Sequence, residues 1–212
     1  IESCDIHDSE RPARPDLLRR ASFERGHRYA VVNLLDPVYG CCPAFVLDRH
    51  WNILMANRAA QRVNHFLLGG RASPHANMLR HVFDPDDLRA ALSNWEEVAG
   101  DLIRHLHNEI AAAPTDATAR ALLDEALAYP DVPQRWRTRE LGTSPSPLLT
   151  TVFRRNGQEL RFFSSITTFA TPRDITLDEL RIECCFPMDD ATAAFCRELK
   201  EKDTDEISMT SS

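Results

Sequence analysis

Cysteine is the residue type in this sequence that most invites a chemical role. Four of the six cysteines form two vicinal pairs, Cys41-Cys42 and Cys184-Cys185. Metal sites usually place at least two residues between cysteine ligands, and neighbouring side chains of a strand point to opposite faces. The spacing therefore favours reduced, mostly buried thiols of a cytosolic protein. A four-cysteine metal site or a redox switch is the alternative.

Histidine is the second candidate for metal binding. His105 and His107 precede Glu109, but residues two apart on a helix lie about 200° apart around its axis and cannot share an ion. The helical pattern H-E-x-x-H is absent. His75 and His81 are scattered, and we interpret them as surface or capping residues. The sequence predicts no metal ligands.

Sequence motifs of catalysis are also missing. There is no G-x-S-x-G, no P-loop and no G-x-G-x-x-G, and 7 glycines leave little room for a loop that cradles phosphate. Ser164 and Ser165 lie within a predicted strand, without the sharp turn that exposes a nucleophile. We expect no catalytic residues, no cofactor and no enzymatic activity.

The composition limits the partners that the chain can bind. The 212 residues carry a net charge of -7, whereas a nucleic-acid-binding face is basic. No apolar run reaches the roughly 18 residues of a membrane span, and the polar opening is unlike a signal peptide. We expect a cytoplasmic protein. Because the first residue is Ile1 rather than Met, we also expect a piece of a longer chain.

The first regular elements are a hairpin and a helix. Residues 44–48 and 52–56 form two short apolar segments around a polar turn, and Asn57 is a good N-cap for the helix that follows. Gly69-Gly70 ends that helix. The preceding residues 1–40 are interpreted as a linker or lead-in segment, with one helix near 16–25.

A helical block occupies residues 71–140. Ser93 and Glu96 have the spacing of a capping box, and apolar residues recur every three or four positions after it. Asp116 begins a further helix. Three strands follow within 148–187, and Asn156-Gly157 is a strong hairpin signal between the first two.

The last predicted strand alternates two sets of residues, and a helix over 190–200 follows it. We expect a disordered tail at 201–212 because it is polar. The order of elements predicts an α+β fold, in which a five-stranded antiparallel sheet receives the helical block between strands 2 and 3. A sheet covered by helices in this way can enclose a pocket.

Three segments of the chain resemble a known family. They are PAFVLDRHWNILMANRAA, NMLRHVFDPDDLRAALSNWEEVAGDLIRHLHNEI and GQELRFFSSITTFATPRDITLDELRIECCFPMDDAT. Together they resemble the ligand-binding domain of MmyB-like transcription regulators. The resemblance implies a PAS-like domain over 41–200 that binds fatty acids and follows an XRE-type helix-turn-helix. No helix-turn-helix occurs in this chain, and residues 154–157 depart from the family's His-Pro-x-x-Gly form.

Three polar or amphipathic residues are candidates for ligand contact. Arg104 could hold a carboxylate by a bidentate pair, or could be a surface arginine on the flank of its helix. Trp95 is either a core residue or a pocket wall. Asn57 is most simply an N-cap, and in a PAS-like shell it would also lie near the cavity mouth.

Apolar strand positions supply the remaining candidates for the pocket wall. They are Phe45, Leu54, Phe162, Ile166 and Phe186. The predicted function is a ligand-sensing domain that binds a fatty acid or similar amphiphile and modulates DNA binding by an attached helix-turn-helix, as a homodimer. The alternative is a PAS-like interaction or dimerisation module whose pocket is filled by side chains, and the size of the cavity discriminates between the two.

Overall fold

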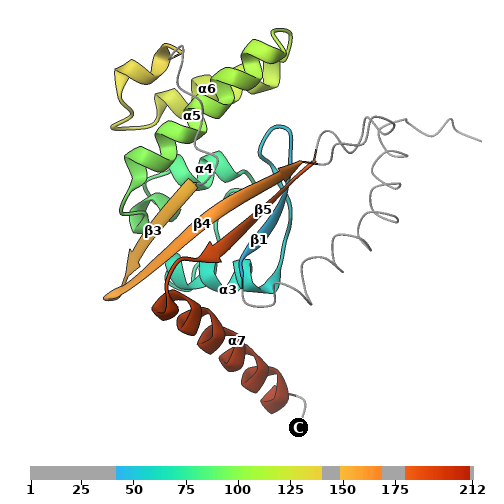
Figure 1. The fold of residues 1–212 in the computed structure, drawn as a ribbon, viewed down its shortest axis with the longest axis vertical. Helices are drawn as coiled ribbons and strands as arrows, with labels where there is room; N and C mark the ends of the chain where they lie inside the picture. The colour runs from blue at the N-terminus through green and yellow to red at the C-terminus, as the bar shows by residue number, and fades with distance from the viewer. Residues whose placement is uncertain (1–41, 140–148, 169–179, 211–212) are drawn as a thin grey trace, which may run out of the picture. The chain divides into compact units, whose positions relative to one another are not determined.

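One antiparallel sheet organises the part of the chain that the computed structural model describes, residues 42–139, 149–168 and 180–210. Its order is β2-β1-β5-β4-β3, and the helical block lies between β2 and β3 in sequence, as predicted (Figure 1). The helix predicted near 16–25 lies outside the described residues. The strands are β1 (Ala44–Asp48), β2 (Ile53–Ala56), β3 (Leu149–Arg155), β4 (Gln158–Thr168) and β5 (Leu180–Pro187).

The turn between β1 and β2 is held by the side chain of Asp48. Its Oδ1 accepts from the backbone nitrogens of His50 at 2.8 Å and Asn52 at 2.9 Å. Trp51 has a φ of 64°, in the left-handed region, and only 1% of it is exposed. The turn was predicted to be polar, but its tryptophan turns inward into the main core of the protein.

The helix after the hairpin confirms the predicted role of Asn57. Its side chain accepts from the backbone nitrogen of Ala60 at 2.8 Å, which caps α3 (Arg58–Leu67). The same oxygen accepts from the backbone nitrogen of Ala44, and the amide donates to the carbonyl of Cys42. Asn57 therefore joins the start of α3 to the start of β1.

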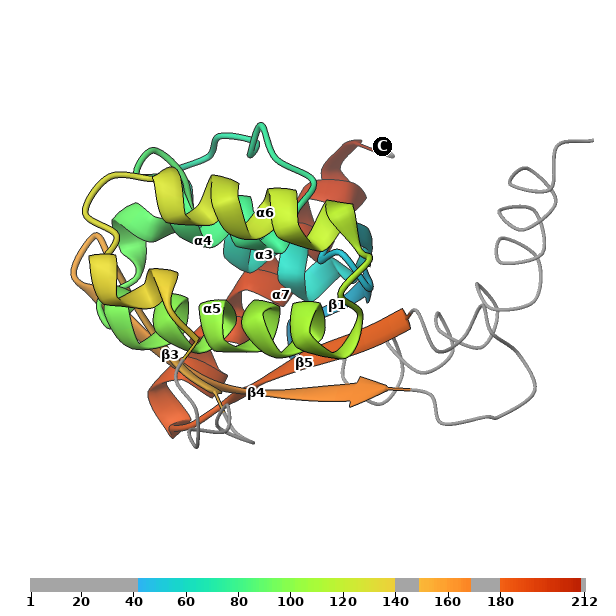
Figure 2. The same cartoon turned by 90° about the horizontal axis from the view of Figure 1, so that it is seen from above.

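The remaining helices cover the sheet on one side. They are α4 (Met78–Phe83), the short 3-10 helices η2 (Leu88–Ala91) and η3 (Gln134–Arg137), α5 (Trp95–Ala112) and α6 (Ala117–Ala128). Figure 2 shows α5 between the sheet and α6. The core between α5 and the sheet includes Phe45, Leu102 and Leu106.

The start of α5 differs from the predicted capping box. Asn94, not Ser93, is the N-cap, and its side chain makes no capping bond. Instead Asn94 accepts from the backbone nitrogen of Val152 and donates to the carbonyl of Thr150, both at 2.9 Å. The edge of β3 offers unpaired backbone groups, and Asn94 satisfies them in place of its own helix.

The β3–β4 hairpin confirms its turn prediction. Asn156 has a φ of 50° and Gly157 a φ of 78°, as a type I′ turn requires at both central residues. The turn fixes a register in which Phe153 pairs with Leu160 and Thr151 with Phe162. These four residues therefore share one face of the sheet.

The two faces of β5 alternate as predicted, but the polar one faces α5. Arg181, Glu183 and Cys185 line the space beneath α5, whereas Phe186 stacks on Phe163 with ring centroids 5.1 Å apart. Phe186 therefore lies on the opposite face of the sheet. The sequence shows which residues share a face, but it does not show which face the helices cover.

The last helix is longer than predicted. α7 runs from Asp190 to Thr210, so the segment 201–210 that was predicted to be disordered is helical. Its first turns pack against α3, where Phe195 lies 4.7 Å from Phe66 between ring centroids. Cys196 is buried in the same apolar cluster.

Candidate ligand-binding site

Two cavities adjoin between the sheet and α5. One is apolar, with a volume of about 70 Å³, and the other is polar, with a volume of about 370 Å³. Four residues belong to the walls of both, namely Leu102, Leu149, Ser164 and Glu183. The cavities therefore meet at one boundary, where β4 and β5 supply the polar side chains.

The apolar cavity is bounded by residues from the sheet, α3, α4 and α5. Phe45, Phe153 and Phe162 stand on the sheet, while Val82 and Val98 approach from the helices. Cys185 also lines it, and burial raises the pKa of this thiol well above its usual value. Burial raises the pKa of Cys184 as well. Both groups are therefore protonated and poor nucleophiles at neutral pH.

The polar cavity contains charges that are already paired. Arg181 Nη1 lies 2.7 Å from Glu109 Oε1, and its guanidinium carbon lies 4.8 Å from the centre of the Trp51 ring. Trp51 Nε1 donates to Glu109 at 3.3 Å. Asp101, with a side chain only 2% exposed, accepts from Arg104 at 2.7 Å.

His105 lies in the wall of the same cavity, near Asp101 and Trp51. Burial lowers its pKa, and this effect outweighs the attraction of Asp101 and Glu109 for the charged form. The imidazole is therefore neutral at neutral pH and adds no positive charge to the cavity.

Glu183 occupies the boundary between the cavities. It lies in the centre of the sheet, paired with Phe45 of β1 and Ile166 of β4, and 9% of it is exposed. Burial raises the pKa of its carboxyl, and a hydrogen bond with the Ser164 hydroxyl opposes that shift only in part. No ion pair joins Glu183 to another residue of the described chain.

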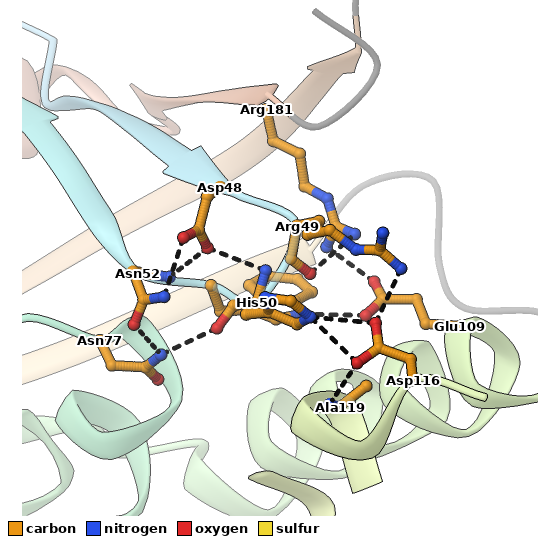
Figure 3. Close-up of polar contacts among 10 residues, drawn as sticks. Asp48, Arg49, His50, Asn52, Asn77, Glu109, Asp116, Ala119 and Arg181 are labelled. Atoms are coloured by element: carbon orange, nitrogen blue, oxygen red, sulfur yellow. Dashed lines mark hydrogen bonds and ion pairs between the residues drawn. The ribbon is translucent and has the colours of Figure 1, made fainter. Parts of the chain in front are cut away.

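A network of fixed charges lies beside the polar cavity, at the β1–β2 turn (Figure 3). Asp116 caps α6 by accepting from the backbone nitrogen of Ala119 at 3.0 Å, and it also contacts Arg49 at 2.7 Å and His50 at 2.9 Å. The bond from Ala119 is the main cause that lowers the Asp116 pKa to about 2. Across the turn, Asn77 donates to the carbonyl of His50.

The structure places three of the predicted ligand contacts at the cavities. Phe45 and Phe162 line the apolar cavity, and Ile166 lines the polar one. Leu54 is 43% exposed, because it stands on the outer side of the edge strand β2. Phe186 lies on the far face of the sheet. Ligand contact by any of these residues stays a prediction.

The three other candidates line neither of the two cavities, and each has a structural partner. Asn57 joins α3 to β1 as described above. Trp95 Nε1 donates to the carbonyl of Val82 at 2.9 Å, and the guanidinium carbon of Arg89 lies 3.8 Å from the centre of its ring. Arg104 pairs with Asp101 and borders a separate hollow of about 20 Å³ beside Trp136.

Four residues at the polar cavity were not singled out from the sequence. They are Trp51, Asp101, Arg181 and Glu183. The sequence did contain a signal for Glu183, namely an acidic residue within an otherwise apolar strand. Such a residue is either buried in the core, exposed on a polar face of the sheet or part of a binding site. The strand order that puts β5 in the centre of the sheet decides among these, and that order depends on contacts distant in sequence.

The described residues hold no group of three or more histidine, cysteine, aspartate or glutamate side chains placed to bind a metal ion. His81 was predicted to be a surface or capping residue, but it is 4% exposed and its ring contacts Asp87 at 3.1 Å. His81 belongs to α4, and Asp87 also caps η2. Among the described helices, none combines the length and apolar character needed to span a bilayer.

The comparison with known proteins agrees with this architecture. A search of curated proteins gives no match to the chain. The family model described as the MmyB-like transcription regulator ligand binding domain matches residues 28–199, which include all five strands and both cavities. The chain belongs to this family of ligand-binding domains of transcription regulators.

Proposed function

We propose that this domain senses a small amphiphile, with fatty acids as the first candidates, and that binding modulates an attached DNA-binding segment. The observation that carries the proposal is the pair of adjoining cavities, one apolar and one polar, beneath α5. An apolar wall with a few polar groups at one end is the common composition of small-molecule sites.

The cavity volumes support a ligand that occupies both spaces. The polar cavity, at about 370 Å³, falls in the range of small-molecule pockets. The apolar cavity, at about 70 Å³, is smaller than the roughly 150 Å³ apolar cavity known to admit benzene. We therefore place the end of an apolar chain against Phe162 and the rest of the ligand in the polar cavity. These volumes favour a ligand-binding pocket over the alternative, an interaction module whose pocket is filled by side chains.

Signalling would proceed by a shift of conformational populations, without chemistry. The cavity walls come from the sheet and from α3, α4 and α5, and α7 packs on α3 and β4. A ligand that prefers one arrangement of these elements changes its population. In a cytoplasmic homodimer carrying an XRE-type helix-turn-helix, such a shift would alter the spacing of the two DNA-binding segments.

The experiment that tests the proposal begins with native mass spectrometry of the purified chain. Organic extraction then identifies any lipid bound in a one-to-one ratio. Addition of saturated fatty acids of increasing length should raise the melting temperature, because the ligand binds the folded state alone. An apo mass together with no thermal shift from any amphiphile contradicts the proposal and favours the interaction module.

A matched pair of variants tests whether the ligand occupies the apolar cavity. Cys185→Leu adds bulk to the apolar cavity and should weaken binding at least about tenfold, because the chain loses its space. Cys184→Leu makes the same change on the other face of β5 and should leave affinity within about threefold. Equal effects of the two variants would place the ligand elsewhere.

A further inference from the structure

We infer that Arg181 holds the carboxylate of a bound fatty acid, and that this carboxylate takes the place of Glu109 in the ion pair that joins α5 to β5. The inference rests on the proposed function and deepens it. It names the anchor of the ligand head and the contact within the domain that ligand binding changes.

The position of Arg181 is the first part of the argument. Among the described residues that line the polar cavity, it is the one permanently charged cation. The β1–β2 turn fixes its guanidinium, because Nη2 donates to the carbonyl of Arg49 at 3.4 Å and the guanidinium carbon lies 4.8 Å from the centre of the Trp51 ring. A fixed guanidinium suits a carboxylate well, since its fork of N–H donors matches two carboxylate oxygens.

The contact with Glu109 is the second part. Glu109 shares its oxygens between two partners, because Oε1 lies 2.7 Å from Arg181 Nη1 and Oε2 accepts from Trp51 Nε1 at 3.3 Å. A ligand carboxylate can offer both oxygens to the guanidinium. The Glu109 side chain is 25% exposed, so it can turn toward water, and an ion pair that solvent reaches contributes little to stability. The ligand therefore meets an anchor that already binds a carboxylate and whose partner is easily displaced.

The path of the ligand is the third part. Arg181, Glu183 and Cys185 occupy alternate positions of β5, and they line in turn the polar cavity, both cavities and the apolar cavity. Cys185 and Arg181 are four residues apart, about 13 Å along the strand. A fatty acid that lies along this face of β5 places its apolar end in the apolar cavity and its carboxylate at Arg181.

The other acidic residues of the wall do not oppose a carboxylate at this point. Asp101 accepts from Arg104 at 2.7 Å, so its charge is balanced within α5. Burial raises the pKa of Glu183, which favours the uncharged form of this residue. When Glu109 turns away, the number of carboxylates in contact with Arg181 stays at one.

Displacement of Glu109 gives the ligand a route to the rest of the domain. Glu109 lies in the last turn of α5, and the chain then leads to Asp116, the cap of α6. Asp116 contacts Arg49 and His50 of the β1–β2 turn (Figure 3). A ligand that separates α5 from β5 at Arg181 therefore shifts the balance between two arrangements of this end of the domain. An uncharged amphiphile does not compete with Glu109 and does not cause this shift.

The test compares decanoate with decanol, two probes of equal chain length, by titration calorimetry on the whole chain at neutral pH. Arg181→Gln removes the cation and should weaken decanoate binding at least about tenfold, while decanol affinity stays within about threefold. Glu109→Gln removes the competing charge, keeps an acceptor for Trp51 and should strengthen decanoate binding about threefold. Arg154→Gln, on β3 with its side chain 67% exposed, is the control and should leave both affinities unchanged.

The outcomes separate this inference from the proposed function. Unchanged decanoate affinity in Arg181→Gln, or equal losses for both probes with the variant folded by circular dichroism, overturns the anchor, while an amphiphile site still stands. Decanoate affinity that does not rise in Glu109→Gln overturns the displacement of Glu109, and this result does not depend on the folding of Arg181→Gln. If neither probe binds the wild-type chain, the proposed function fails and the inference fails with it.

Discussion

Asp116 is a part-buried carboxyl group in the network at the β1–β2 turn, and Glu183 is a buried carboxyl group in the cavity wall. Their surroundings have opposite effects on the carboxyl pKa. Asp116 receives a backbone hydrogen bond from Ala119 and contacts Arg49 and His50, and its pKa falls to about 2. Burial raises the pKa of Glu183, and the neighbouring Ser164 hydroxyl opposes that shift only in part. The surroundings of Asp116 favour its anion, whereas those of Glu183 favour its protonated form.

The difference teaches how to separate a structural carboxyl from a binding one. Both carboxylate oxygens of Asp116 accept hydrogen bonds from residues of the same chain, because Asp116 caps α6 and contacts the β1–β2 turn (Figure 3). Glu183 lines open volume and retains hydrogen-bonding capacity. A buried polar group that the fold does not need for stability is the better candidate for ligand contact.

The largest effect is expected from removing the structural carboxyl. Asp116→Ala should lower the free energy of unfolding by about 2 kcal/mol, because α6 loses its cap and the turn loses its anion. Urea denaturation measures the change. Asp124→Ala, at an exposed position of the same helix, is the control and should stay within about 0.5 kcal/mol. Similar losses from both variants would mean that the network in Figure 3 contributes no stability of its own.

Removing the carboxyl group of Glu183 should change the free energy of unfolding in the opposite direction. Glu183→Leu should raise the free energy of unfolding of the ligand-free chain by about 1 kcal/mol, because a buried group without a cation is replaced by an apolar one. The same urea denaturation applies, with Asp124→Ala at its exposed position as the control. If Glu183→Leu lowered the free energy of unfolding as much as Asp116→Ala does, Glu183 would stabilise the fold. The two carboxyl groups would then not differ in role.

Much of the fold was predictable, because local signals determine it. Asn57 caps its helix, and Asn156-Gly157 supplies the two positive φ angles of its hairpin, whatever the rest of the chain does. The alternation along β5 was also visible. These features depend on neighbours within a few residues, so the sequence alone carries them.

The site was less predictable, because it depends on packing between distant segments. Phe186 of β5 was predicted to line the pocket, but the opposite face of β5, with Arg181 and Glu183, lies beneath α5. The turn that contains Trp51 was predicted to be polar, but the indole lies at the cavity, in contact with Arg181 and Glu109. Arg104 has the chemistry of an anchor, but Asp101 occupies it one turn away.

A third prediction concerns the residue that links the two regions. Trp51 follows His50 of the fixed network and contacts Glu109 and Arg181 of the cavity. Trp51→Phe should lower the free energy of unfolding by about 1 kcal/mol, because the bond from Nε1 to Glu109 is lost. In a double-mutant cycle with Glu109→Gln, the combined loss should be smaller than the sum. Strict additivity would mean that Trp51 and Glu109 act independently.

The smallest effects are expected in the pH dependence of stability, where the two carboxyls again differ in sign. The folded pKa of Asp116 lies below its ordinary value of 3.8, so its contribution is present above that pH and is lost as pH falls toward about 2. The folded pKa of Glu183 lies above its ordinary value of 4.5. Its contribution is full below 4.5 and is lost as pH rises through the folded pKa.

Urea denaturation over a series of pH values separates these contributions. The difference in free energy of unfolding between wild type and Asp116→Asn should shrink below pH 3.8. Above pH 4.5, the free energy of unfolding of Glu183→Gln should rise relative to that of wild type. Each slope should stay below about 1.4 kcal/mol per pH unit, the limit for one proton. Arg181, His105 and Cys185 share the cavity walls with Glu183, and all three are unchanged in Glu183→Gln, so the difference curve isolates the carboxyl. A flat curve for Glu183→Gln would mean that Glu183 titrates as a solvated group. The contrast with Asp116 would then be one of geometry alone.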